Sequence, residues 1–345
     1  MNPPLDGLPS YHGREVLVTG GAGAIGGHLV RALVSAGANV TVLDDLSSGF
    51  RTRLPHTSQI KFVRGSVTHR SQLRRVFETG PAVVFHLAAL FANQNSVEHP
   101  ERDLRVNGLG TLRVLQESVR HNVERFIYAA SSSSHPRAGD SGCNEPGRLA
   151  TPYQITKLLG EMYCRFFSEH HGLHVCAARL FNAYGPGELP GPYRNVIPNW
   201  IYLALQQKPL RITGTGRETR DFTFVSDLVE GLMLLGALEV NGAPCLDLGT
   251  GEETTILELA RAINALTSNP SPIEYVPARK WDHQVRRGAD LTQACALIGY
   301  KPRIPLHLGL KRTVNWFQTN WKRIQVSASA AMARLEKRPP APTPA

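Results

Sequence analysis

Short apolar runs alternate with segments of helical periodicity through the first half of the chain. The runs predict strands at 16–18, 40–43, 60–63, 82–86, 125–128 and 175–180. The periodic segments predict helices over 25–34, from about 71, over 104–119 and over 152–171. Apolar strands that alternate with helices are typical of a parallel sheet covered by helices on both faces. The pattern therefore predicts an α/β fold built on a doubly wound, Rossmann-type parallel sheet.

The pattern changes near residue 184, where loops rich in Pro and Gly replace the regular alternation and helices are expected at 196–206 and 256–266. A chain of 345 residues also exceeds the size at which one core usually keeps growing. The expected boundaries are 12–183 plus about 221–249 for the Rossmann domain, about 184–220 plus 250–320 for a smaller interleaved α/β lobe, and 1–11 and 325–345 for loose termini.

The composition, 42% hydrophobic and 19% charged, is that of a folded protein. No apolar run approaches the ~20 residues needed to span a bilayer, and the N-terminal segment lacks a basic and then apolar signal. We therefore expect a cytoplasmic protein. The five cysteines, Cys143, Cys164, Cys176, Cys245 and Cys295, form no Cys-x-x-Cys pair. Neither a disulfide framework nor a metal site is expected.

The formal net charge of +10 is compatible with nucleic acid, an anionic membrane or an acidic small molecule as partner. Lys and Arg form no block of five or more, and the aromatic residues do not alternate with them as a stacking platform would require. A phosphorylated small molecule needs only a few placed arginines. The charge pattern therefore favours such a ligand over nucleic acid or membrane.

A glycine-rich turn follows the first predicted strand. Gly20, Gly21, Gly23 and Gly26 lie between that strand and the first helix, and residues 21–26 fit the pattern Gly-x-Gly-x-x-Gly. A bare backbone lets a pyrophosphate approach closely, and the helix N-terminus offers unpaired N–H groups and the positive end of its dipole. The turn therefore predicts a dinucleotide site.

The second predicted strand ends at Asp44, 18 residues beyond Gly26. This is close to the ~20 residues at which a carboxylate binds the adenosine ribose in such folds. A carboxylate accepts from the ribose hydroxyls and repels a 2′-phosphate, so Asp44 favours NAD over NADP. The alternative is that Asp44 is a simple turn or capping residue.

Tyr153 and Lys157 are spaced by four residues at the start of a predicted helix, and a run of serines from Ser131 ends the strand before it. Four residues place the phenol and the ammonium on one helix face. A neighbouring Lys⁺ and a nicotinamide cation would both favour the phenolate. Such a tyrosine can accept a proton from a sugar hydroxyl while hydride leaves the same carbon. As an isolated spacing, the pair would be an ordinary solvated helix face.

Several separated motifs stand in order along the chain. They are TGGAGAIG at 19–26, DDLSSG at 44–49, HLAA at 86–89, NGLGT at 107–111, YxxxK at 153–157, RLFNAYGP at 179–186 and RDF at 220–222. The set resembles the extended short-chain dehydrogenase/reductase family and, within it, the NAD-dependent nucleotide-sugar 4-epimerases that act on UDP-hexoses or UDP-glucuronate. The resemblance runs from about residue 14 to 316.

The resemblance implies roles for individual residues. For NAD it implies contacts from Gly20, Gly23, Ala24, Ile25, Asp44, Asp45, Ser48, Gly49, Ser66, Val67, Leu87, Ala88, Ala89, Asn107, Ala129, Tyr153 and Lys157. For the UDP-sugar it implies contacts from Ser131, Ser132, Tyr153, Asn182, Val196, Arg220 and either Arg286 or Arg287, with Arg287 preferred. Tyr153 would be the base, Lys157 would hold the nicotinamide ribose and lower the pKa of the phenol, and Ser131 would bind the reacting hydroxyl.

Two positions depart from the family pattern. Ser66 stands where the family usually has an aspartate that contacts adenine, which predicts weaker cofactor affinity. His135-Pro136 follow the serines where Val-Tyr-Gly is usual, so the loop geometry there is expected to differ.

The reaction is inferred from the residues after Ser131. Dehydratases of the family carry an Asp-Glu pair there, and decarboxylases typically keep a Glu, whereas Ser132, Ser133 and Ser134 have no ionisable group. Epimerisation needs only transient oxidation at C4, rotation of the 4-keto sugar and return of hydride. We therefore predict a 4-epimerase, an isomerase that keeps its NAD. A decarboxylase or dehydratase that uses Glu145 or Glu188 remains an alternative, as does a non-catalytic NAD-binding sensor.

The sugar is predicted from the loop at 187–195, which supplies Arg194. Arg194 and Arg287 together could bind a hexuronate carboxylate. The favoured pair is therefore UDP-glucuronate and UDP-galacturonate, with UDP-glucose or UDP-N-acetylglucosamine as alternatives. By resemblance, we also expect a homodimer formed through helices near 104–120 and 152–171.

Overall fold

The computed structural model describes residues 9–134, 149–239, 242–282 and 285–336. Its central feature is a seven-stranded sheet in the order β3-β2-β1-β4-β5-β6-β9, with every neighbouring pair parallel. The strands are β1 (Glu15–Thr19), β2 (Asn39–Asp44), β3 (Ile60–Arg64), β4 (Val83–His86), β5 (Arg125–Ser131), β6 (Val175–Leu180) and β9 (Cys245–Leu248). The predicted Rossmann-type fold is confirmed.

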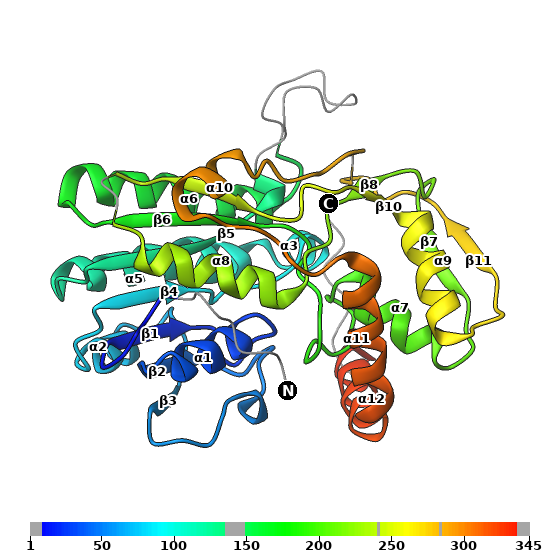
Figure 1. Cartoon of the computed structure of the whole chain (residues 1–345), viewed down its shortest axis with the longest axis horizontal. Coiled ribbons are helices and arrows are strands. Elements are labelled where there is room, and N and C mark those ends of the chain that lie inside the picture. The colour runs from blue at the N-terminus through cyan, green and yellow to red at the C-terminus, as the bar shows by residue number, and fades with distance from the viewer. Residues whose placement is uncertain (1–8, 135–148, 240–241, 283–284, 337–345) are drawn as a thin grey trace.

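Helices cover both faces of this sheet (Figure 1). One face shares a core with α1 (Gly26–Ser35), α8 (Val225–Ala237) and α10 (Thr292–Ile298). The other face packs on α2 (Arg70–Phe77), α5 (Thr111–Arg120) and α6 (Pro152–His171). Both faces of the sheet are therefore shielded from water, which explains why the strands are apolar throughout. The carboxyl ends of the strands meet at one edge, where ligands bind in folds of this kind.

A smaller lobe lies beside that edge (Figure 1). Its core is formed mainly by α7 (Val196–Ala204), α9 (Ile256–Thr267) and α11 (Leu306–Thr319), together with the parallel pair β7 (Leu210–Thr213) and β11 (Ile273–Val276). The antiparallel pair β8 (Thr219–Arg220) and β10 (Thr254–Thr255) lies between this lobe and the sheet. No helix of the described segments is long and apolar enough to cross a membrane.

The helix expected over 104–119 is not one regular element. It is preceded by α3 (Asn93–Glu98) and α4 (Pro100–Asp103), and its first part, Leu104–Gly110, is π-helical before α5 begins. Gly108 and Gly110 weaken the α-helix here, and the side chain of Asn107 bonds the backbone of Leu90 from this segment. Single π-helical turns are frequent at functional sites.

The expected domain boundaries need three corrections. Tyr11, placed in the loose N-terminus, is buried and its hydroxyl donates to Met233 O at 2.7 Å. At the other end, α12 (Trp321–Glu336) replaces the loose segment expected from 325, because Ile324 and Ala328 are buried. Residues 291–300, assigned to the smaller lobe, pack on the sheet, where the buried Tyr300 donates its hydroxyl proton to Gly249 O at 3.0 Å.

Candidate active site

The glycine turn joins β1 to α1 at the carboxyl edge of the sheet. Gly20 has a left-handed φ of +71°, and a Cβ there would lie 2.7 Å from Ala88 N. A Cβ on Gly26 would clash with Gly20 O. The first turn of α1 carries no acidic side chain, and Ile25 before it provides no side-chain cap. This tight turn and its uncapped helix N-terminus fit a pyrophosphate.

Asp44 ends β2 beside this turn. Its Oδ2 accepts from Ala22 N at 2.9 Å and its Oδ1 from Leu46 N at 2.8 Å. Each carboxylate oxygen has a second lone pair, so the carboxylate can still accept from ribose hydroxyls. Burial raises the pKa of Asp44, and the two backbone N–H groups oppose that rise. Asp44 is thus a buried acceptor fixed at the carboxyl edge of the sheet, and its role at the ribose stays a prediction.

The remaining cofactor positions line the same edge. Leu87, Ala88 and Ala89 form a half-buried loop after β4, whereas Asp45 and Ser48 are exposed in the loop after β2. Ser66 accepts from Thr68 N at 3.3 Å, and its own N–H donates to Gln72 Oε1 at 2.7 Å. The serine that replaces the family's aspartate therefore stabilises its own turn.

A neutral histidine holds the loop after β4. Thr111 Oγ1 donates to Asn107 O at 2.6 Å, so it accepts from His86 Nε2 at 2.9 Å. Burial lowers the pKa of His86 to about 3, so its Nδ1 accepts from Thr19 Oγ1 at 2.7 Å. Thr19 Oγ1 in turn accepts from Ala88 N at 3.3 Å. The buried chain fixes Ala88 against the glycine turn.

Asn107, predicted to contact NAD, is used by the protein itself. Its amide accepts from Leu90 N at 2.7 Å and donates to Leu90 O at 3.1 Å and to Asp103 Oδ1 at 2.8 Å. Asp103 also accepts from Thr156 Oγ1 at 2.6 Å. In this structure Asn107 therefore positions the loop at the cofactor edge and links it to α6.

Tyr153, Lys157 and Ser131 come together at the end of β5, as the sequence predicts. Tyr153 is held at the start of α6 by a capping box at Thr151 and by its N–H, which donates to Ser96 Oγ at 3.0 Å. Ser131 lies near enough to the phenol to lower its pKa. Lys157 Nζ donates to Ala129 O at 2.8 Å and lies 5.9 Å from the centroid of the Tyr153 ring.

The pKa of Tyr153 differs from the sequence expectation. Burial raises it to about 12, while the hydrogen bond from Ser131 and the charge of Arg287 lower it. Burial also lowers the pKa of Lys157 to about 8. In the protein alone, burial therefore outweighs the lowering expected from Lys157, and the phenol is protonated at neutral pH.

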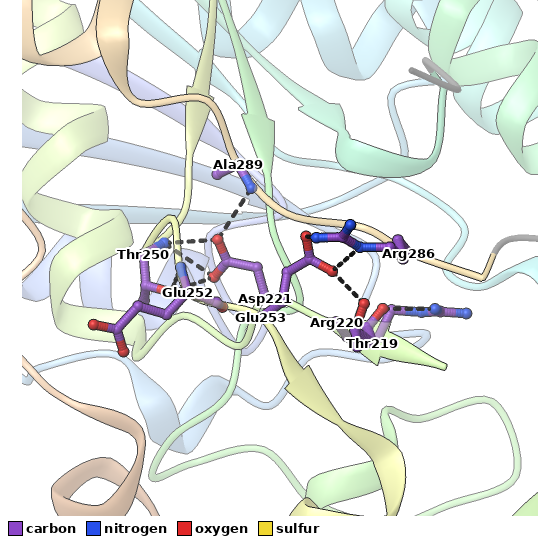
Figure 2. A network of polar contacts seen from close by, with 8 residues as sticks. All are labelled: Thr219, Arg220, Asp221, Thr250, Glu252, Glu253, Arg286 and Ala289. Atoms are coloured by element: carbon purple, nitrogen blue, oxygen red, sulfur yellow. Dashed lines mark hydrogen bonds and ion pairs between the residues drawn. The ribbon is translucent and has the colours of Figure 1, made fainter. Parts of the chain in front are cut away.

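The residues expected at the nucleotide diphosphate lie around β8. Asn182 Nδ2 donates to Asp221 O at 2.8 Å, and Arg220 Nη1 donates to Thr219 O at 2.8 Å. The segment after residue 284 runs beside β8, with Asp221 N donating to Arg287 O at 2.9 Å. The two candidate arginines of this segment have different surroundings. Arg286 is 73% exposed and pairs with Glu253 (Figure 2), while Arg287 lies close enough to Tyr153 to lower its pKa.

Arg194, predicted to bind a hexuronate, contacts the loop after β2 in this structure. Its Nη2 donates to Ser48 O at 2.9 Å, in the loop that follows Asp44. The loop containing Arg194 thus contacts the sheet lobe, and the role of Arg194 at a hexuronate stays a prediction. Val196, next in the predicted set, begins α7.

Three more side chains join the sheet lobe to the smaller lobe. His28 Nε2 donates to Pro186 O at 2.8 Å, Arg323 Nη2 donates to Thr52 Oγ1 at 2.7 Å, and Arg53 donates to Gly187 O. Together with Arg194–Ser48 they form what we call the interlobe latch. No sequence signal marked Arg53 or Arg323, since their partners are more than a hundred residues away.

The alternative carboxylates are placed as follows. Glu188 is buried beside Arg53 and Arg194, at the latch, and burial raises its pKa to about 7. Glu145 and His135-Pro136 lie outside the described residues. Glu161, which the sequence did not single out, has Oε1 at 3.0 Å from Ser134 Oγ, and both of its oxygens pair with Arg179.

Comparison with known proteins identifies the family. Residues 16–244 match the model of the NAD dependent epimerase/dehydratase family. The chain belongs to this family. A UDP-glucose 4-epimerase of Mycolicibacterium smegmatis is 32% identical over 88% of this chain and 98% of its own length. A UDP-N-acetyl-alpha-D-glucosaminuronate decarboxylase of Bacillus cytotoxicus is 32% identical over the same shares.

Solved structures agree with this assignment. The epimerase Mth375 of Methanothermobacter thermautotrophicus is 47% identical, with a TM-score of 0.88 over 92% of this chain and 96% of that one. The Bordetella bronchiseptica enzyme WbmF, in complex with NAD+ and UDP, is 30% identical, with a TM-score of 0.83 over 95% of this chain and 99% of that one. The expectations of an enzyme and of NAD as its cofactor are thereby confirmed. The relatives include 4-epimerases, which are isomerases, as well as decarboxylases.

Proposed function

We propose that the chain is a UDP-sugar 4-epimerase that retains its NAD. The observation that carries the proposal is the set of groups around Tyr153. Ser131 and Lys157 lie beside it, and the serines that follow Ser131 provide no ionisable side chain. Glu161, which comes near Ser134, is held by Arg179 through both oxygens. These groups serve proton transfer at one hydroxyl and supply no second acid for elimination or decarboxylation.

The roles of the residues follow from their contacts. NAD, when bound, supplies the acceptor and donor of hydride, and its positive ring adds a charge that favours the phenolate. Tyr153 then accepts the proton of the C4 hydroxyl while Ser131 orients that hydroxyl. Lys157, fixed by Ala129 O, holds the cofactor ribose. After the 4-keto sugar has turned about its diphosphate, Tyr153 returns the proton to the C4 oxygen.

For the sugar, two candidates follow from the arginines. Interconversion of UDP-glucuronate and UDP-galacturonate is one candidate, because the Arg287 guanidinium lies near enough to Tyr153 to lower its pKa and can serve a sugar carboxylate as well as the diphosphate. Interconversion of UDP-glucose and UDP-galactose is the second candidate. This second candidate is favoured by the contact of Arg194, the other arginine expected at a carboxylate, with Ser48 O in the loop after β2.

The test is turnover without added cofactor. The purified protein is denatured and its released nucleotide identified, and the intact protein is incubated with a panel of UDP-hexoses, UDP-N-acetylhexosamines and UDP-hexuronates. We expect bound NAD and a C4 epimer of unchanged mass. A product lighter by CO2 or by water would replace the proposal with a decarboxylase or a dehydratase, and bound NAD with no turnover of any sugar would favour a sensor.

We propose that two chains pair through α5, α6 and the π-helical segment before α5. Large apolar side chains are exposed there, with Met162 62%, Leu104 54% and Ile155 51% accessible. Burying them in a partner would remove this apolar surface from water. Light scattering during gel filtration should give the mass of a dimer, and Met162→Lys should shift it toward the monomer. A monomeric wild-type mass would contradict this part of the proposal.

A further inference from the structure

Asp221 is a buried carboxylate at the junction between the sheet and the smaller lobe, and none of the steps above uses it. It follows Arg220 of β8 and its side chain has no exposed surface. Figure 2 shows it at the centre of a network drawn from three segments of the chain. A buried ionised carboxylate is costly unless donors surround it, so the donors around Asp221 are informative.

The carboxylate accepts from two other segments of the chain. Oδ1 accepts from Thr250 N at 2.9 Å and from Thr250 Oγ1 at 2.7 Å, and Oδ2 accepts from Gly251 N at 2.8 Å. Oδ2 also accepts from Ala289 N at 3.2 Å. These partners are N–H and O–H donors of the loop after β9 and of the segment that carries Arg287. The carboxylate therefore fastens that segment to β8 and to the end of the sheet.

The backbone of Asp221 makes two further bonds, to the other residues of the expected diphosphate site. Its N–H donates to Arg287 O at 2.9 Å, and its C=O accepts from Asn182 Nδ2 at 2.8 Å. Arg220 is its covalent neighbour. One residue thus sets the relative positions of Asn182, Arg220 and Arg287, which come from three distant parts of the sequence.

The surroundings leave no room for another arrangement. A Cβ on Gly249 would lie 2.7 Å from Asp221 Oδ2 and would overlap the Cβ of Ala289. The loop after β9 can therefore approach the carboxylate only because residue 249 is glycine.

We propose that Asp221 is a positioning residue for the nucleotide diphosphate. It acts through Asn182, Arg220 and Arg287, and it does not touch the ligand. The proposal rests on the proposed function, because it takes these three groups as the ones that bind a UDP-sugar. Bidentate recognition of phosphate depends on the spacing of the donors, so a shift of the Arg287 segment should weaken ligand binding before it affects proton transfer at Tyr153.

Asp221→Asn is the direct variant, since an amide keeps the shape but turns one acceptor into a donor facing Gly251 N and Ala289 N. We expect the dissociation constant for UDP, measured by calorimetry, and the KM for the UDP-sugar to rise about tenfold or more. The NAD content should stay at the wild-type level, and kcat at saturating substrate should change less than threefold. Thr250→Val keeps the backbone donor and removes the hydroxyl, which donates to Asp221 Oδ1 and accepts from Glu252 N at 3.1 Å. It should raise the same constants by about threefold.

Asp227 provides the matched control. It is also a buried aspartate, and its Oδ2 accepts from Arg303 N at 3.0 Å and Ile304 N at 2.9 Å, on α8 and away from β8. Asp227→Asn should lower the melting temperature and leave UDP affinity unchanged. If Asp221→Asn or Thr250→Val also leaves UDP affinity within twofold of the wild type, the positioning role is wrong. If Asp221→Asn does not fold, Thr250→Val decides. If the wild-type protein itself binds no UDP, the proposed function fails first.

Discussion

The cofactor side and the nucleotide-sugar side of the site are built in different ways. The cofactor side is formed by the glycine turn, Asp44 and the loop after β4, each of which lies directly after a strand of one sheet. The proposed nucleotide-sugar side gathers Asn182, Arg220 and Arg287 from three separate segments, and both Asn182 and Arg287 bond to the backbone of Asp221. Each part of the cofactor side is therefore formed by one short motif. The nucleotide-sugar side is formed only when distant segments come together in the fold.

The largest expected effect lies where the two sides meet. Tyr153→Phe removes the phenolic oxygen proposed to accept the substrate proton, so kcat should fall about 10³-fold. NAD content should stay unchanged, because the cofactor side does not depend on this hydroxyl. Single-turnover assays and the nucleotide released on denaturation measure the two effects. An undiminished rate would show that another group is the base.

A smaller effect is expected from Arg287, on the nucleotide-sugar side. Arg287→Gln should lower kcat/KM at neutral pH about tenfold, since a charged donor to phosphate is lost. Because the Arg287 charge lowers the pKa of Tyr153, its removal raises that pKa. The ascending limb of the pH profile should then move to higher pH.

Arg286 supplies the control for this variant. It is the neighbouring arginine, but it is exposed and paired with Glu253. Arg286→Gln should leave both kcat/KM and the pH profile near wild type. If the two variants behave alike, the assignment of Arg287 over Arg286 is wrong.

The smallest effect is expected from Arg194, whose contact in this structure is with the loop after β2. Arg194→Ala removes one bond of the interlobe latch, to Ser48 O, and should speed the loss of NAD about threefold. The ratio of turnover between UDP-glucuronate and UDP-glucose should not change. Arg211→Ala, which breaks an exposed pair between Arg211 of β7 and Glu274 of β11, is the matched control. A changed ratio of turnover between the two UDP-sugars would show that Arg194 acts in the hexose pocket.

The sequence predicted the sheet, its flanking helices and the meeting of Tyr153, Lys157 and Ser131, because local periodicity and strand ends determine them. It could not predict which way the loop at 187–195 folds, since the partner of Arg194 is 146 residues away. Asp221 lies within the RDF motif at 220–222, but the sequence offered no reason to assign it a role. Its partners in the loop after β9 and in the segment of Ala289 are also distant in the sequence. The pKa of Tyr153 was misjudged because burial, the largest influence on it, depends on the whole fold.

The account is tested most directly by following the hydrogen at C4. A UDP-sugar that the enzyme turns over is prepared with deuterium at C4 and incubated with the protein without added NAD. If hydride leaves and returns within one bound cofactor, the epimer should carry its deuterium at C4, with no loss to water and no change in mass. Loss of the label to solvent, or a product lighter by CO2 or water, would contradict the epimerase mechanism.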